Sequence, residues 1–324
     1  MTDGPRKDGA TVRIRRSTAV EVQVPATSAN LGPGFDCLGL ALGIHDHLLA
    51  IVTEDPGVRV DVEGEGAGQL PTDETHLVVR AAALGFEAMG VATPGLLVKC
   101  ANAIPQGRGL GSSAAAIIAG LQIARGLVED GDQVLPDSAV LDLATQMEGH
   151  PDNVAAALLG GFTTAWMEST SHAGVLVRSV HPSIQPIVAI PPAPVATAHA
   201  RQLLEESVPR EAAVFNIGRT AALTHAIGVD PSLLFAATED RLHQDARASV
   251  YPQSHALMSA LRGQGLAAVI SGAGPTVLIL TDTPDEAARL VASISGAEGG
   301  AEWLIHSVAV DPDGVRTRTR ALRD

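Results

Sequence analysis

The sequence predicts a soluble protein of two α+β domains, and three observations support this fold class. The chain has 324 residues, enough for two domains of about 150 residues each. Hydrophobic residues make up 46% and charged residues 18%, a composition typical of proteins that bury a core. Strand-like and helix-like segments are mixed in both halves, without the regular repeat of a doubly wound parallel sheet. We therefore expect one domain over residues 11–174 and a second over residues 175–324.

The first half of the chain begins with segments of strand character. TVRIRRSTAVEVQVP, HLLAIVTE and VRVDVEGEG are rich in β-branched residues and partly alternate between apolar and polar positions. THLVVRAAALGFEAM predicts a helix, with Thr75 as its N-cap and Gly90 just beyond its end. GLLVKCANAIP returns to strand, and the stretch from Pro105 then opens a helix that runs to about Val128. DSAVLDLATQMEGH and DNVAAALLGG add two helices, the second capped by Asp152, before the strand GFTTAWM.

The second half contains a new mixture of strands and helices. IQPIVAIPP is typical of a strand. The stretch from TAHARQ to SVP, then REAAVFNIGRTAALTHAIG and PSLLFAATEDRLHQDARA, have helical character. GLAAVISGAGPTVLILT predicts two strands joined by a glycine-rich turn. PDEAARLVASIS predicts a helix with proline in its first turn, and AEWLIHSVAV predicts a closing strand.

Charge and cysteine content argue against several classes of function. The formal net charge of −14 argues against nucleic acid as the main partner, because phosphate backbones attract clustered Lys and Arg. Two cysteines support no disulfide framework, and no Cys/His grouping has the spacing of a zinc site. The N-terminus is polar, and no apolar run approaches the ~18 residues that span a bilayer. We expect a cytoplasmic protein with neither a nucleic-acid nor a membrane partner.

The stretch PQGRGLGSSAAAIIAG, which begins at Pro105, is a candidate phosphate-binding loop. A helix N-terminus attracts anions through its unpaired N–H groups, and glycines let the backbone approach them closely. The known loop patterns fit poorly, however. Gly111 stands where the P-loop has its lysine, and the glycine spacing differs from GxGxxG. The glycines alone leave two interpretations open, a phosphate site or a plain connection to a buried helix.

Three further segments favour the phosphate site. PATSANLGPGFDCLGLAL holds Asn30 and Asp36 among apolar neighbours, and EGHPDNVAAALLGG carries Glu148 and Asn153 at the junction of two helices. SGAGPT forms a second small-residue loop between strands. With these motifs in this order, the chain resembles the GHMP kinases, the family of galactokinase, homoserine kinase, mevalonate kinase and phosphomevalonate kinase.

Within that family, PATSANLGPGFDCLGLAL and EGHPDNVA look like the corresponding segments of homoserine kinases. The resemblance implies a two-domain GHMP kinase fold. Its N-terminal, ATP-binding domain is similar to domain 2 of ribosomal protein S5, and its ferredoxin-like C-terminal domain contributes substrate contacts. The resemblance also implies ATP-dependent phosphorylation of the L-homoserine hydroxyl to O-phospho-L-homoserine in threonine biosynthesis. Mg²⁺ is the implied cofactor, and a homodimer the implied assembly.

By the same resemblance, the glycine-rich loop wraps the ATP phosphates with backbone N–H groups in place of a lysine charge. Either Ser112 or Ser113 is expected to hold Mg²⁺ together with Glu148, because this hard cation prefers hydroxyl and carboxylate oxygens. Residues that contact adenine cannot be assigned. The expected ATP-binding residues are Pro105, Gln106, Gly107, Arg108, Gly109, Leu110, Gly111, Ser112, Ser113, Ala114 and Ala115.

Homoserine carries an ammonium, a carboxylate and a hydroxyl, so its site requires an acid, an arginine and an acceptor. TAHAR matches a T-x-x-x-R element of the family, and an arginine in LHQDAR matches one found in relatives. For each arginine, a plain position on a surface helix is the alternative. The expected substrate-binding residues are Asn30, Asp36, Asn153, Thr197, Arg201 and Arg247, of which Asn153 and Arg201 are also expected to be catalytic.

Asn153 stands where several relatives carry an aspartate base, and an amide is a poor proton acceptor. We therefore expect catalysis by positioning and charge stabilisation, which a loose phosphoryl-transfer transition state permits. Two alternatives remain open. One is another GHMP small-molecule kinase, of the mevalonate-pathway type. The other is a non-catalytic binding protein, since S5-like folds also occur in RNA-binding proteins.

Overall fold

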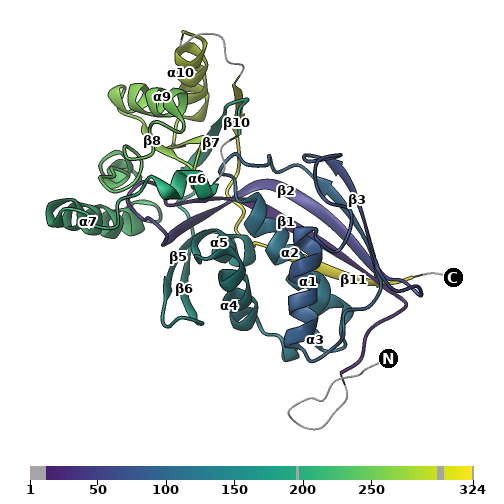
Figure 1. The fold of residues 1–324 in the computed structure, drawn as a ribbon. Coiled ribbons are helices and arrows are strands. Elements are labelled where there is room, and N and C mark those ends of the chain that lie inside the picture. The colour runs from purple at the N-terminus through teal and green to yellow at the C-terminus, as the bar shows by residue number, and fades with distance from the viewer. Residues whose placement is uncertain (1–11, 195–196, 298–302, 323–324) are drawn as a thin grey trace.

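Two β-sheets with helices packed against them make up the computed structural model of the protein (Figure 1). It describes residues 12–194, 197–297 and 303–322. Within these ranges, no helix combines the length and the apolar character that crossing a membrane requires. The predicted α+β fold class is confirmed.

The first sheet has seven strands and is built around the long strands β1 and β2. Its order is β11-β1-β2-β4-β3, while β5 pairs with β2 and β6 pairs with β5. All neighbours are antiparallel except β3 and β4. The β1–β2 register shifts between Pro25 and Ala26, where a proline without an N–H fits an irregular ladder. The strands are β1 Thr18–Ala29, β2 Leu38–Val52, β3 Val58–Gly64, β4 Leu96–Asn102, β5 Phe162–Met167, β6 Ala173–Arg178 and β11 Arg316–Ala321.

Helix α2 lies at the centre of the first core, between the sheet and neighbouring helices (Figure 1). Ile117, Ile118 and Leu121 are at most 1% exposed, and each such burial contributes about 1.5–3 kcal/mol. This packing fixes the N-terminus of α2 and hence the glycine-rich loop before it. The helices of this domain are α1 Leu77–Ala88, α2 Ser112–Leu127, α3 Gly131–Val134, α4 Asp137–Glu148 and α5 Asp152–Leu159.

The second sheet has four antiparallel strands in the order β10-β7-β9-β8. Numbered along the chain, this is the 4-1-3-2 order of a ferredoxin-like domain, with α9 before its second strand and α10 before its fourth. A separate core joins α9 and α10 to this sheet. The elements are β7 Gln185–Ile190, α9 Pro252–Gly263, β8 Ala267–Ile270, β9 Val277–Thr281, α10 Pro284–Ala297 and β10 Leu304–Ser307.

A helical segment lies between β7 and α9. It contains α6 Thr197–Gln202, α7 Arg210–Ala226, the 3₁₀ turn η1 Pro231–Leu233 and α8 Leu234–Ala237. The predicted helix from TAHARQ to SVP is therefore wrong beyond Gln202, and the one over PSLLFAATEDRLHQDARA is wrong beyond Ala237. In the second case the cause is Asp240, whose carboxylate accepts the N–H groups of Leu242, His243 and Gln244 and holds a turn instead.

Several other details differ from the sequence prediction. The N-cap of α1 is His76 rather than Thr75, because the Nδ1 atom of His76 accepts the N–H of Val78 at 3.2 Å. Strands β6 and β11 and helix α9 have no counterpart in the prediction. The domain boundary at 174/175 stays a prediction; it falls within β6, and the C-terminal β11 completes the first sheet.

Candidate active site

A cavity of about 330 Å³ is lined by residues from both halves of the chain. Most of the site residues predicted from the sequence line it. Ala114, which is fully buried in the core, does not. Thr197 belongs to α6 but its side chain lies outside the described part of the chain, so its role stays a prediction. The predicted residues in the wall are Asn30, Asp36, Pro105, Gln106, Gly107, Arg108, Gly109, Leu110, Gly111, Ser112, Ser113, Ala115, Glu148, Asn153, Arg201 and Arg247.

The glycine-rich loop leads from β4 into the N-terminus of α2, at the middle of the cavity wall. Gly111 is the N-cap of α2 and has φ 70°, a left-handed conformation that favours glycine. A Cβ at this position would overlap the Oγ1 atom of Thr27. No side chain of the described residues caps the helix. The first N–H groups of this 16-residue helix therefore remain available for an anion.

The SGAGPT segment, between β8 and β9, lies against the glycine-rich loop. The hydroxyl of Ser271 donates to the carbonyl oxygen of Gly109 at 2.6 Å, and the N–H of Thr276 donates to that of Arg108 at 3.2 Å. A Cβ on Gly109 would overlap the Ser271 carbonyl oxygen, so this approach requires glycine. The Arg108 guanidinium donates to the Pro191 carbonyl oxygen at 2.7 Å. These three hydrogen bonds fasten the loop to the second domain.

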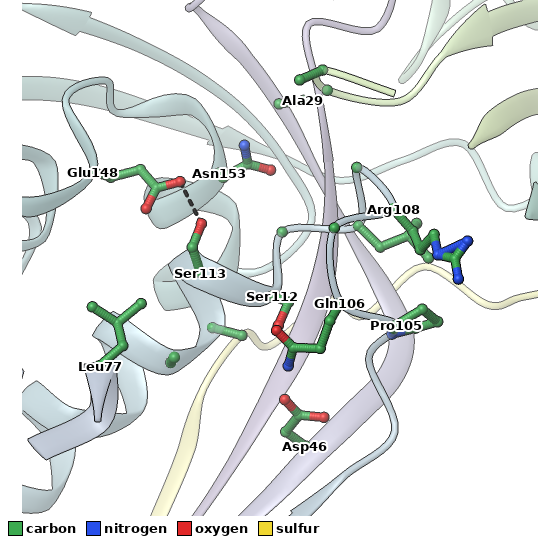
Figure 2. Close-up of a pocket in the computed structure, with 18 of the residues that line it drawn as sticks. Ala29, Asp46, Leu77, Pro105, Gln106, Arg108, Ser112, Ser113, Glu148 and Asn153 are labelled. Carbon is green, nitrogen blue, oxygen red and sulfur yellow. Dashed lines mark hydrogen bonds between the residues drawn. The ribbon is translucent and has the colours of Figure 1, made fainter. Parts of the chain in front are cut away.

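Ser113 and Glu148 meet at the edge of the cavity (Figure 2). The hydroxyl of Ser113, in the first turn of α2, donates to the Oε1 atom of Glu148 at 2.7 Å. Glu148 is the last residue of α4, where a carboxylate opposes the helix dipole and gains no stability from it. Between the two serines that the sequence left open, the structure therefore brings Ser113, and not Ser112, to the carboxylate.

Asn153 is held from behind by Thr27, which projects from β1. The Thr27 hydroxyl donates to the Asn153 amide oxygen at 2.8 Å, so the amide nitrogen of Asn153 remains free to donate a hydrogen bond in the cavity.

Asp152, the neighbour of Asn153, is not an N-cap, because it is itself the first residue of α5. Its Oδ1 atom accepts the Asn153 N–H at 2.6 Å and lies 2.6 Å from His150 Nδ1. Burial opposes the charged form of His150, but this bond and nearby carboxylates raise its pKa above the usual value.

The loop between β1 and β2 carries Asn30 and Asp36. The Asn30 amide donates to the Gly272 carbonyl oxygen at 2.9 Å, and its oxygen accepts the Asp36 N–H at 3.0 Å. Asn30 is therefore already engaged on both sides and fixes the position of Asp36. His150, Asp152 and Asp36 also have ligand atoms within 4.8 Å of one another.

Two arginines from the second half of the chain complete this end of the cavity. Arg201, on α6, forms a two-pronged ion pair with Asp36, with N···O distances of 2.7 and 3.0 Å. Arg247 is only 2% exposed and donates from Nε to the Ala200 carbonyl oxygen at 3.1 Å. Both guanidinium groups lie within 5.4 Å of the centre of the Phe35 ring. Phe35 also lines the cavity, although the sequence analysis did not select it.

The opposite end of the cavity is lined by residues that the sequence analysis did not assign to a site. Asp46, below the loop in Figure 2, is buried, and its Oδ1 atom accepts the N–H groups of Ala103 and Ile104 at 2.7 and 2.9 Å. His76 is 4% exposed, and its Nε2 atom has no hydrogen-bond partner among the described residues. Burial lowers the pKa of His76. The flanking residues Leu48, Leu70 and Leu77 are apolar.

These residues fit a bound Mg²⁺–ATP. The uncapped N-terminus of α2 suits phosphate groups, and the Ser113 hydroxyl with the Glu148 carboxylate suits a hard cation. His76 and its apolar neighbours in the cavity wall suit the base of a nucleoside. The end at Asp36 offers paired opposite charges for a second small molecule.

Comparison with known proteins decides the family. The family model for the GHMP kinase N-terminal domain matches residues 76–161, and the model for the GHMP kinase C-terminal domain matches residues 230–299. A homoserine kinase of Streptomyces coelicolor is 51% identical over 299 residues, which cover 92% of this chain and 94% of that protein. The chain belongs to the GHMP kinase family. It is an ATP-dependent small-molecule kinase of that family.

Further comparisons place the GHMP kinase fold over nearly the whole chain. A homoserine kinase of Clavibacter michiganensis subsp. michiganensis is 51% identical over 296 residues, 91% of this chain and 92% of its own. The crystal structure of homoserine kinase from Cytophaga hutchinsonii superposes with a TM-score of 0.80 at 26% identity, covering 93% of this chain and 97% of that one. The resemblance that the sequence motifs indicated is confirmed.

Proposed function

We propose that this GHMP kinase is a homoserine kinase, which transfers the terminal phosphoryl group of ATP to the side-chain hydroxyl of L-homoserine. The observation that carries the proposal is one cavity with two chemically different ends. The uncapped helix α2 lies in the middle, and Asp36, Arg201 and Arg247 lie together at one end. The two relatives at 51% identity, both named homoserine kinases, support the same substrate.

The phosphate groups of ATP would be held by the loop from Pro105 to Ala115, chiefly by the N–H groups at the start of α2. Mg²⁺ would be held by Ser113 and Glu148, whose oxygens are 2.7 Å apart. The chemistry that Mg²⁺–ATP supplies is a transferable phosphoryl group whose negative charge is partly neutralised.

The substrate carboxylate would bind the arginines and its ammonium the carboxylates. Of the two arginines, Arg247 is the stronger site for the substrate carboxylate, because its guanidinium is almost fully buried and has no carboxylate partner among the described residues. A buried guanidinium without a counter-ion is costly, so an anionic ligand stabilises it. Asp36 and Asp152 would receive the ammonium, and Thr197 is assigned to the substrate by its motif alone.

Asn153 and Arg201 would act by positioning and charge rather than as bases. The amide oxygen of Asn153 is taken by Thr27, which leaves its NH₂ group as a donor toward the cavity. A donor in that place orients the reacting oxygens and stabilises charge that develops on them. The protein would hold the hydroxyl in line for transfer and need no strong base, as a loose transition state permits.

The test is ADP release measured by a coupled assay with L-homoserine, L-serine, L-threonine and mevalonate, each with and without Mg²⁺. We expect Mg²⁺-dependent release with L-homoserine only. Activity with mevalonate instead would favour the alternative, a GHMP kinase of the mevalonate-pathway type. No release with any acceptor, together with retention of RNA on a filter, would favour a non-catalytic binding protein.

The remaining expectations belong to the same proposal. The enzyme would work in the cytoplasm as a homodimer, without a nucleic-acid or membrane partner. Its net charge of −14 supports the lack of a nucleic-acid partner. Light scattering coupled to size-exclusion chromatography tests the dimer, since a single species at the mass of one 33.2 kDa chain would contradict it.

A further inference from the structure

Strand β6 is an edge of the first sheet with free backbone groups. It pairs with β5 alone among the described strands, and the two strands form a hairpin beside α4 (Figure 1). The N–H of Ala173 donates to the Oδ1 atom of Asp142, on α4, and not to β5. Because the direction of these groups alternates along an antiparallel strand, Val175 and Val177 also direct their N–H and C=O groups away from β5. A row of such groups at the edge of a sheet is a template for another strand.

One face of this hairpin is apolar and exposed. Trp166 is 40% exposed and Leu176 is 54% exposed. The Trp166 ring lies over Gly174, its direct partner on β6, where a Cβ would come within 2.3 Å of the ring. Leu176 follows Gly174 by two positions and therefore points to the same face. Edge strands usually carry a lysine, a proline or a bulge that prevents further pairing, and β6, with the sequence AGVLVR, has none of these.

Two charges without partners lie at opposite ends of the hairpin. Arg178, the last residue of β6, is exposed and forms no ion pair with the described residues. Glu168 follows β5 just beyond Trp166, and it too is exposed and without an ion pair among them. A second hairpin of the same sequence that runs in the opposite direction therefore brings each arginine to the tryptophan and the carboxylate of the other. The surface is complementary to itself.

We propose that β6 pairs antiparallel with β6 of a second copy of this chain, across a twofold axis at Leu176, and so joins the two first sheets into one. This inference rests on the homodimer of the proposed function and names its surface. Val175 of each copy lies opposite Val177 of the other, so every free N–H and C=O group of these valines is paired. A register centred on Val175 would instead set Val177 against Ala173, whose N–H is already bound to Asp142.

The same register matches the side chains. Leu176 meets Leu176 of the other copy, since directly opposite side chains have Cβ atoms about 4.5–5.5 Å apart. Arg178 lies opposite Gly174 of the other copy, whose missing side chain gives the guanidinium access to the Trp166 ring. Arginine and tryptophan are enriched where interfaces bind most strongly, and the twofold axis provides each of these contacts twice.

Leu176→Cys tests the register. Facing residues of a non-hydrogen-bonded antiparallel pair have Cα atoms about 4.5 Å apart, which is within the range of a disulfide. The matched control is Leu304→Cys, because Leu304 is 56% exposed and lies on β10, an edge of the second sheet. After mild oxidation, we expect most of Leu176→Cys to run as a covalent dimer on a non-reducing gel. Leu304→Cys should stay monomeric, and both variants keep the two native cysteines.

Sedimentation velocity over a dilution series measures the strength of the dimer. Leu176→Arg sets like charges against each other at the axis and should weaken dimerisation about a hundredfold. Arg178→Glu should weaken it about tenfold, and adding Glu168→Arg should restore most of that loss, because each carboxylate again meets a cation. Leu304→Arg should leave the dimer unchanged. These side chains are exposed, so each variant should keep the far-UV circular dichroism spectrum of the folded chain.

The outcomes separate this surface from the proposed function. If the unaltered protein sediments as one 33.2 kDa chain at every concentration, the homodimer and this surface are both wrong, whereas the assay of ADP release still decides the substrate. If the protein is a dimer that Leu176→Arg leaves intact, the surface is wrong and the homodimer stands. Equal cross-linking of Leu176→Cys and Leu304→Cys overturns the register. The two substitutions of Leu176 answer independently, so the failure of one to fold leaves the other as the test.

Discussion

Replacing Asp46 by Asn should change how the stability of the protein depends on pH. Asp46 lies on β2, is 5% exposed, and accepts two backbone N–H groups from the chain just after β4. Burial raises the pKa of Asp46 from its usual value near 3.8 to about 6, although those two hydrogen bonds oppose the rise. Asn has the same shape and keeps an oxygen for both bonds, but it has no proton to lose.

The size of the effect follows from the pKa difference. The folded state holds the Asp46 proton more tightly than the unfolded chain, so this group's contribution to stability is full below pH 3.8 and is lost as the pH rises through about 6. A difference of about two pKa units corresponds to a loss of about 3 kcal/mol. Asp46→Asn lacks this loss and should gain about that much relative to the unaltered protein between pH 4 and pH 7.5.

The measurement is urea unfolding, followed by far-UV circular dichroism, of both proteins at several pH values between 4 and 7.5. Comparing the two proteins cancels the histidines and every other titrating group that they share. The reasoning is refuted if the difference in unfolding free energy stays constant over this range, or if it moves in the opposite direction.

Four further substitutions test the phosphate loop and its supports. Gly111→Ala should destabilise the fold by about 3 kcal/mol, seen as a lower Tm, because its Cβ would overlap Thr27 and its φ is positive; an unchanged Tm contradicts the packing. Ser113→Ala and Glu148→Gln should each raise the Mg²⁺ concentration for half-maximal activity about tenfold, and an unshifted Mg²⁺ titration would remove them from the metal site. Thr27→Val should lower kcat about tenfold through Asn153 with KM for ATP unchanged, whereas an equal change in both would show a general disturbance.

The glycine-rich loop and its helix could be predicted from the sequence because their signals are local. A strand that ends just before Pro105, a run of glycines and an alanine-rich helix lie next to one another in the chain. The site residues were chosen by family resemblance, and the structure gathers Asn30, Asp36, Arg201 and Arg247 at one cavity. Periodicity or composition could not have selected these four, since they come from distant segments.

What the sequence did not predict depends on contacts between distant residues. Strand β11, RTRTRA, is mostly exposed and charged, and it becomes a strand by pairing with β1 almost 300 positions away. The segment after Ala237 has helical periodicity, but Asp240 satisfies its backbone groups in a turn, helped by a hydrogen bond from Asn216. The sequence did not assign Asp46 or His76 to the site, because a single polar residue in a strand or at a helix start is usually structural, and only the folded chain shows that they line the cavity.

The β1–β2 loop stores strain where the proposed substrate would bind. Asn30, Leu31 and Asp36 have positive φ angles of 66°, 50° and 56°, a conformation that is unfavourable for side chains other than glycine. Leu31 is fully buried, and Asn30 bonds both to Gly272 of the second domain and to the Asp36 backbone. Contacts between the two domains thus hold Asp36 in an orientation that the loop alone would not favour. The two-domain fold is therefore required for the geometry of this acid, and not only for covering the cavity.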